Sequence, residues 1–161
     1  MKRVAVMMGS ESDLPVMRKA KDVLDGLGVP CTMTIASAHR TPDRVIELVA
    51  SYEADDVGVI IAGAGAAAHL AGAVAGRTVL PVIGVPLASG ALQGLDALLA
   101  TVQMPSGVPV ATVAVDGAAN AGVLAAQILA VHDTTLAERL RKRRAESAQT
   151  VLDKARELED G

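Results

Sequence analysis

Short apolar runs alternate along this chain with segments of helical periodicity, and this alternation constrains the fold more than any other feature. The runs cover residues 3–8, 30–36, 57–62, 79–85 and 109–115. Helical patterns cover about residues 12–27, 42–54, 66–75, 92–103 and 118–132. Strands that alternate with helices predict a parallel sheet with helices on both faces. We therefore expect an α/β, three-layer, flavodoxin-like parallel sheet with strand order 2-1-3-4-5.

The segment from residue 134 to residue 159 departs from this alternation, because it is one long, charged helical pattern. Its apolar positions form a thin stripe of Leu136, Leu140, Ala148, Val151, Leu152, Ala155 and Leu158. Such a stripe favours packing against a partner surface. With 161 residues, the chain is expected to form a single domain, 1–161, whose extended C-terminal helix serves subunit packing.

Composition argues against several classes of partner. The net charge is −3 and Tyr52 is the one aromatic residue, so neither bulk electrostatics nor stacking favours nucleic acid. The uncharged run of residues 78–95 approaches the length of a membrane span, but prolines and glycines interrupt it, and we expect buried core rather than a membrane segment. The lone Cys31 and the absence of a signal-peptide pattern predict a cytoplasmic protein.

The segment Gly9–Asp13 follows the first apolar run and opens the first helix. Free backbone N–H groups at such a junction favour an anion, so Ser10 is a candidate phosphate ligand. Pro15 must lie in the first helical turn, which also allows Ser12 or Asp13 to be an ordinary N-cap. If Asp13 is not the cap, its carboxylate can accept hydrogen bonds from a ribose diol.

In the segment Ser37–Pro42, the imidazole of His39 stands next to the permanently charged guanidinium of Arg40. The segment lies between the second predicted strand and the helix that follows it. Thr41 can cap that helix and Pro42 can open it. His39 and Arg40 are then expected at the carboxyl edge of the sheet, where ligands of open α/β sheets bind. An imidazole there can exchange protons near neutral pH.

The segment Gly63–Ala68 satisfies the loose dinucleotide pattern G-x-G-x-x-A, but no acidic residue follows at the expected distance. A tight loop that lets a ligand approach the backbone at Gly65 is the simpler interpretation. His69 fits a hydrogen-bonded loop residue and a substrate contact equally well. The spacing of His39, His69 and His132 suggests no shared metal, so no metal site is predicted.

Four separated motifs together resemble the PurE family of purine biosynthesis over nearly the whole chain. They are Gly9–Asp13, Ser37–Pro42, Ala62–Leu70 and Val102–Thr112. The resemblance implies a metal-free and cofactor-free mutase that moves the carboxylate of N5-carboxyaminoimidazole ribonucleotide from the exocyclic nitrogen to ring carbon C4. It also implies a homo-octamer.

The resemblance assigns roles to individual residues. His39 matches the family's proton-transfer residue, and the same histidine can protonate the nitrogen and later take the proton from C4. Ser10, Asp13 and Arg40 match positions that bind the ribose phosphate. The remaining substrate-binding candidates are Ser37, Gly65 and His69. Because carbon dioxide must be retained between the two steps, the small uncharged residues of 63–70 suit a closed pocket.

Two alternatives remain beside the mutase. Related carboxylases that use carbon dioxide directly typically carry lysine after the histidine, so Arg40 favours the mutase. A non-catalytic flavodoxin-like binding or signalling domain would have the same fold, but the acidic cluster that receiver domains need at strand ends is missing here. Ala66, Ala71 and Ser106 depart from residues common in the family, which bears on loop rigidity and subunit packing.

Overall fold

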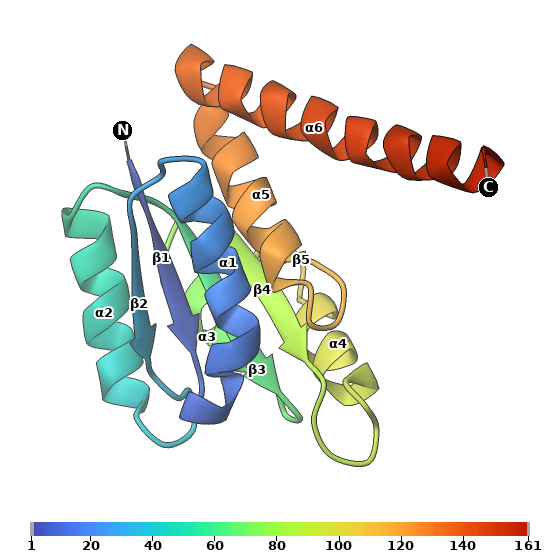
Figure 1. Ribbon diagram of the computed structural model, residues 1–161. Helices are drawn as coiled ribbons and strands as arrows, with labels where there is room; N and C mark the ends of the chain where they lie inside the picture. The colour runs from blue at the N-terminus through green and yellow to red at the C-terminus, as the bar shows by residue number, and fades with distance from the viewer. Residues whose placement is uncertain (1, 161) are drawn as a thin grey trace.

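Residues 2–160, which the computed structural model describes, form a five-stranded parallel sheet between two layers of helices (Figure 1). The strands are β1 (Arg3–Met8), β2 (Cys31–Ile35), β3 (Val57–Gly65), β4 (Val82–Leu87) and β5 (Ala111–Thr112). Their order is β2-β1-β3-β4-β5, and every neighbouring pair is parallel. This is the predicted fold class and strand order.

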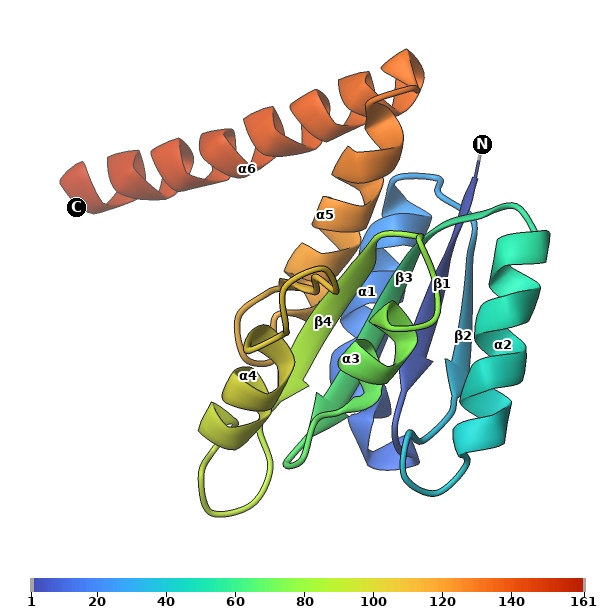
Figure 2. The same ribbon diagram turned by 180° about the vertical axis from the view of Figure 1, so that it is seen from behind.

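The helices follow the strands in the predicted alternation. They are α1 (Leu14–Gly26), α2 (Pro42–Ala54), α3 (Leu70–Ala75), α4 (Leu95–Val102), α5 (Ala118–Ala130) and α6 (Thr134–Glu159), with a short 3-10 helix η1 (Glu11–Asp13) before α1. The helices α1 and α5 cover one face of the sheet, and α2, α3 and α4 cover the other (Figures 1 and 2). Gly28, with a φ of 67°, follows the end of α1 in the left-handed conformation that glycine adopts without strain.

Alternate side chains of each central strand supply the two halves of the core. In β1, Val4, Val6 and Met8 pack toward α1 and α5, whereas Ala5 and Met7 pack toward α2 and α3. All five are buried, and each large apolar side chain taken from water contributes about 1.5–3 kcal/mol. The core therefore holds the sheet rigid beneath the loops at its carboxyl edge.

Several elements differ in extent from the sequence prediction. The helix expected over 92–103 begins only at Leu95, because Gln93 and Gly94 adopt left-handed φ values of 50° and 90°, and the strand expected over 79–85 begins only at Val82. The helix expected over 66–75 begins only at Leu70, because Ala66 adopts a left-handed conformation with a φ of 50° and the chain turns there first.

The strand expected over 109–115 pairs only at Ala111–Thr112. Pro109 has no N–H to donate on one side. On the other side the amides of Val113 and Asp116 still donate to the carbonyls of Gly84 and Pro86 in β4, but Asp116 at a φ of 57° ends the extended conformation.

The helix α6 begins on the body of the protein and then leaves it (Figures 1 and 2). Its first turn is fixed by Asp133, whose carboxylate accepts a hydrogen bond from the Leu136 amide at 2.9 Å, and Leu136 is fully buried. Leu140 also packs against the core, so this member of the apolar stripe has its partner within the domain. Beyond it, Val151 and Leu152 are 66% and 53% exposed. Within residues 2–160, no helix combines the length and apolarity needed to cross a membrane.

Candidate active site

The loops that follow β1, β2, β3 and β4 meet at one edge of the sheet, because the carboxyl ends of parallel strands lie together. They enclose a pocket of about 350 Å³. Every residue predicted for the site lines it: Ser10, Asp13, Ser37, His39, Arg40, Gly65 and His69. The other residues of its wall are Gly9, Ser12, Ala38, Ala64, Ala66, Ala67, Leu70 and Ser89.

The first loop is folded back on itself by its own side chains. The Ser10 amide donates to Asp13 Oδ2 at 2.9 Å, and the Ser12 hydroxyl donates to Ser10 Oγ at 3.1 Å. Asp13 occupies the N-cap position of α1, as one of the two alternatives expected, but its side chain makes no cap to α1. Its carboxylate instead closes a capping box at η1 with Ser10, and Ser12 lies within η1 rather than at a cap. Both side chains also line the pocket.

Opposing electrostatic effects act on the pKa of the Asp13 carboxyl group. Partial burial raises the pKa of its carboxyl group above the ordinary value of 3.8, and this effect outweighs the hydrogen bonds from Ser10, Ser12 and Gly9 and the nearby charge of Arg40, all of which lower it. The ionised carboxylate is thus costlier here than in water. Such a group gains from a ligand that supplies further hydrogen-bond donors.

The second loop is a turn closed by Ser37 and Thr41. The Ser37 amide donates to Thr41 Oγ1 at 2.9 Å, while the Thr41 hydroxyl and amide donate to the Ser37 carbonyl at 3.2 and 3.0 Å. Thr41 precedes α2 but makes no side-chain cap to it, contrary to the sequence-based expectation. Its hydroxyl instead fixes the turn that presents His39 and Arg40.

Arg40 ties the first two loops together. Its Nη2 donates to the Gly9 carbonyl at 2.8 Å, and its backbone amide donates to Ser37 Oγ at 3.2 Å. A guanidinium carries five N–H donors in a planar fork, so these contacts leave donors for an anion. The arrangement places a fixed positive charge at the mouth of the loop that follows β1.

His39 and His69 touch each other across the pocket. His39 Nε2 lies 2.8 Å from His69 Nδ1, with the ring centroids 4.9 Å apart and the rings at 81°. Sequence reasoning chose both histidines but did not foresee that they meet. No spacing rule links them, because one follows β2 and the other follows β3, 30 residues later.

The third and fourth loops approach each other at Gly65. A Cβ at this position would lie 2.6 Å from Ser89 Oγ and 3.3 Å from the Leu87 carbonyl, so a larger residue would displace the Ser89 side chain and crowd the β4 backbone. Sequence reasoning missed Ser89. The signal that would have found it is its place just after β4, at the same edge as the other loops.

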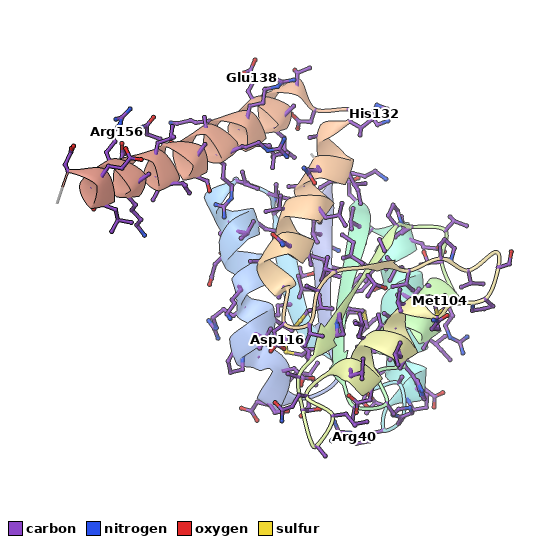
Figure 3. All side chains as sticks on the ribbon, turned by 90° about the vertical axis from the view of Figure 1, so that its right-hand side faces the viewer. Arg40, Met104, Asp116, His132, Glu138 and Arg156 are labelled. Atoms are coloured by element: carbon purple, nitrogen blue, oxygen red, sulfur yellow. The ribbon has the colours of Figure 1, made fainter. Side chains whose placement is uncertain are left out.

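Metal-ligating side chains do not gather in the described chain. Among residues 2–160, no three His, Cys, Asp or Glu side chains come together in a way that could hold a metal ion. His132 lies far from the pocket, and Figure 3 shows it at the opposite end of the molecule from Arg40. Cys31 is half-buried at the start of β2, and burial raises the pKa of its thiol.

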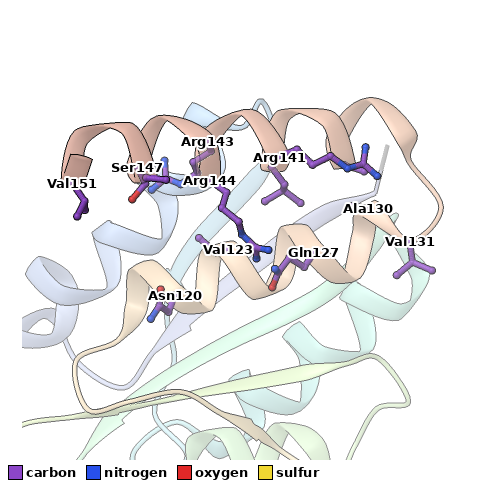
Figure 4. A pocket seen from close by; sticks show the side chains of 13 residues that line it. Asn120, Val123, Gln127, Ala130, Val131, Arg141, Arg143, Arg144, Ser147 and Val151 are labelled. Atoms are coloured by element: carbon purple, nitrogen blue, oxygen red, sulfur yellow. The ribbon is translucent and has the colours of Figure 1, made fainter. Parts of the chain in front are cut away.

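A second and larger hollow lies between α5 and α6 (Figure 4). It has a volume of about 800 Å³ and is lined by Asn120, Val123, Gln127, Ala130, Val131, Ala137, Leu140, Arg141, Arg143, Arg144, Ser147, Ala148 and Val151. In Figure 4, Arg144 reaches from α6 toward Gln127 of α5. We call this hollow the α5–α6 cleft. It contains cations and apolar side chains but no histidine or carboxylate.

Comparison with known proteins gives one consistent result. The family model described as AIR carboxylase matches residues 3–150. The N5-carboxyaminoimidazole ribonucleotide mutase of Pyrococcus horikoshii is 54% identical over 98% of this chain and 89% of its own length, and that of Thermotoga maritima is 52% identical over 99% and 93%. The crystal structure of Treponema denticola PurE superimposes with a TM-score of 0.89 at 31% identity, covering 96% of this chain and 97% of that one.

Proposed function

This chain belongs to the AIR carboxylase family, and on that premise we propose that it is an N5-carboxyaminoimidazole ribonucleotide mutase of purine biosynthesis. The observation that carries the proposal is the convergence of His39, Arg40 and the uncharged wall around Gly65 on one pocket of about 350 Å³. A proton carrier, an anion ligand and a space for carbon dioxide are what a metal-free carboxylate transfer requires.

His39 acts as both general acid and general base. As the carbamate N–C bond breaks, its electron pair goes to the exocyclic nitrogen, which receives a proton from the His39 imidazolium, and carbon dioxide is released. C4 of the aminoimidazole then attacks carbon dioxide. The neutral His39 takes the proton from C4, which restores the aromatic ring and returns the histidine to its starting state.

The loop after β1 and the turn after β2 hold the ribose phosphate. Arg40 offers the phosphate charge-assisted hydrogen bonds from its planar fork. Ser10 adds a hydroxyl, and Asp13 accepts hydrogen bonds from ribose hydroxyls. The Ser37 side chain, already in contact with the Arg40 amide, completes the polar rim. These contacts orient the heterocycle toward His39.

Small residues keep carbon dioxide beside C4. Ala64, Gly65, Ala66 and Ala67 form a wall without charges, hydroxyls or space for a larger side chain at Gly65. Apart from the Ser89 hydroxyl beside Gly65, such a wall offers water few side-chain hydrogen-bond partners, and it holds the two reactants at close range. A carboxylase that takes carbon dioxide from solution is the second candidate, because the matching family model is described as AIR carboxylase.

We propose that the distal half of α6 takes part in self-association, into the homo-octamer that the family resemblance implies. Val151 and Leu152 are largely exposed on a helix that projects from the body, and the α5–α6 cleft lies beside them. Exposed apolar groups of this kind are stabilised by burial between subunits. A cytoplasmic location agrees with a lone free cysteine, since disulfides are rare in that compartment.

The test is direct conversion. Purified protein is mixed with N5-carboxyaminoimidazole ribonucleotide in the presence of a chelator, and the 4-carboxy product is quantified by chromatography against a no-enzyme control. We expect catalytic turnover by a colourless protein without added metal or ATP. A protein that binds the ribonucleotide but forms no product above the control would instead favour a non-catalytic binding domain.

A further inference from the structure

The contact between His39 and His69 restricts where protons can sit. At 2.8 Å, two ring nitrogens are within hydrogen-bond distance, and one must donate to the lone pair of the other. The 81° angle between the rings excludes stacking. The centroid distance of 4.9 Å is nearly as long as this nitrogen contact allows, so the two nitrogens face each other along the line that joins the rings.

The direction of the hydrogen bond follows from the protonation states that catalysis needs. An imidazolium has N–H groups on both nitrogens and can only donate. When His39 is protonated, its Nε2 therefore donates, and Nδ1 of His69 must accept. The opposite hydrogen bond, from Nδ1–H of His69 to Nε2 of His39, is possible only while His39 is neutral. In that case the direction of the hydrogen bond would have to reverse in every turnover.

We propose that His69 is a positioning residue for the reaction: its Nδ1 accepts a hydrogen bond from Nε2–H of His39 throughout the cycle. This leaves Nδ1 of His39 as the atom that gives the proton to the exocyclic nitrogen and later takes one from C4. His69 itself stays neutral, with its own proton on Nε2. The inference rests on the proposed function, in which His39 is the acid and base.

Both rings are carried by backbone that is fixed locally. The turn bearing His39 is closed by the hydrogen bonds between Ser37 and Thr41. The His69 amide donates to the Ala67 carbonyl at 2.8 Å, and its carbonyl accepts from Ala73 at 2.9 Å at the start of α3. The side chain of His69 makes no cap to α3, so its imidazole is not required to hold the helix.

Two other ionisable side chains line the same pocket, Asp13 and Arg40. Arg40 binds the Gly9 carbonyl and Asp13 binds the Ser10 amide. Neither has a hydrogen bond to His39 or His69 in the described part of the chain. The partner that orients His39 is therefore the second histidine rather than the carboxylate that orients many catalytic histidines.

Nuclear magnetic resonance on the full-length protein tests the contact without substrate. In protein with 15N-labelled histidine, we expect a scalar coupling between His39 Nε2 and His69 Nδ1 across the hydrogen bond, and its loss in His69→Ala. His132→Asn, at the far end of the molecule, serves as the assignment and folding control. Absence of the coupling in the resting protein would overturn the proposal.

Steady-state kinetics test the role. His69→Ala should lower kcat at least ~10-fold, a part of the ~10²–10⁴-fold that positioned acid–base catalysis supplies. His69→Asn, whose Oδ1 can replace the Nδ1 acceptor, should recover most of that loss although an amide does not titrate. If Ala keeps full kcat, or if Asn falls as low as Ala, His69 is not a positioning residue. If the wild-type protein is inactive but shows the scalar coupling, the proposed function is wrong while the hydrogen bond between His39 and His69 is confirmed.

Discussion

The pocket at the sheet edge and the α5–α6 cleft differ less in what their volumes suggest than in which side chains line them and from which segments these come. The cleft is larger, at about 800 Å³ against about 350 Å³, but only two consecutive helices line it, and no histidine or carboxylate faces into it. The pocket receives side chains from four loops that are far apart in the chain. Convergence of titratable groups from separate loops, rather than size, marks the reactive site.

The two regions also differ in how firmly their residues are held. In the pocket, the first two loops are closed by hydrogen bonds between their own side chains and backbone, those of Ser10 with Asp13 and of Ser37 with Thr41, and the loop after β3 is closed by backbone hydrogen bonds. On α6, the side chains beyond Leu140 are mostly exposed. We therefore expect changes in the pocket to alter chemistry and changes along distal α6 to alter assembly.

The largest effect is expected at His39. His39→Asn keeps polarity and approximate size but removes proton exchange, so turnover should fall at least ~10²-fold, the low end for loss of a general acid or base. Product affinity and oligomer mass should be unchanged. Steady-state assays and calorimetric titration check both points, and near-normal turnover would refute the assignment of His39.

The next effect is expected at Arg40. Arg40→Ala should weaken binding of the phosphorylated product about 10- to 100-fold, since charge-assisted hydrogen bonds contribute about 1.5–3 kcal/mol. Binding of the dephosphorylated nucleoside should change little. Arg18→Ala, an exposed position on α1, is the matched control. Equal losses for the nucleotide and the nucleoside would show that Arg40 is not the phosphate ligand.

An effect of a different kind is expected on distal α6. Truncation after Asp133 is a poor test, because it also removes the buried Leu136 and would damage the core. Val151→Glu with Leu152→Glu should instead lower the oligomer mass measured by light scattering, since charges replace apolar groups that subunit contact would bury. An unchanged octamer mass would exclude these positions from the interface.

A matched control exists for this pair on the same helix. Lys154→Gln with Arg156→Gln changes the net charge by the same amount at exposed polar positions. We expect it to leave the mass unchanged. A monomeric wild type at micromolar concentration would overturn the proposal of a homo-octamer.

The smallest effect is expected at Asp13. The raised pKa of Asp13 means that its ionised carboxylate destabilises the folded state. This loss of stability is absent below the ordinary pKa of 3.8 and grows as the pH rises from there through the folded-state pKa. Asp13→Asn should therefore raise Tm at pH 7, by no more than about 3 °C for a chain of this size. The gain should shrink toward pH 4.

The control for Asp13 is Asp22→Asn, an exposed carboxylate on α1. It removes one carboxylate at an exposed position and so controls for the change in net charge. Thermal unfolding at several pH values measures both variants. A lower Tm for Asp13→Asn at pH 7 would mean that the hydrogen bonds to this carboxylate outweigh its burial, which reverses the sign of the electrostatic argument.

Sequence periodicity predicted the sheet well, because strands such as β1 and β3 are buried on both faces and read as continuous apolar runs. It was wrong where backbone conformation rather than hydropathy decides. Ala66 adopts a left-handed conformation, so α3 begins later than predicted, and the alanine-rich sequence contains no residue that would predict this turn. Likewise, a two-residue β5 inside an apolar run depends on where pairing with β4 stops.

The residues of the site could be predicted one at a time, since each follows a strand at the carboxyl edge. Their mutual contacts could not. The hydrogen bond from Arg40 to the Gly9 carbonyl and the meeting of His39 with His69 depend on the twist of the sheet and the reach of two loops. Ser89 follows β4 at the same edge, which is a weak signal, and its contact with Gly65 becomes visible only in the structure.

The measurement that tests the central claim most directly follows the carboxylate itself. Substrate labelled in the carbamate carbon is turned over in excess unlabelled bicarbonate, with correction for spontaneous carbamate breakdown. If carbon dioxide is trapped against the wall around Gly65, recapture by C4 outruns escape, and the product keeps most of its label. Extensive loss of label would mean that carbon dioxide exchanges with solvent, which contradicts the mutase mechanism and favours a carbon dioxide-dependent carboxylase.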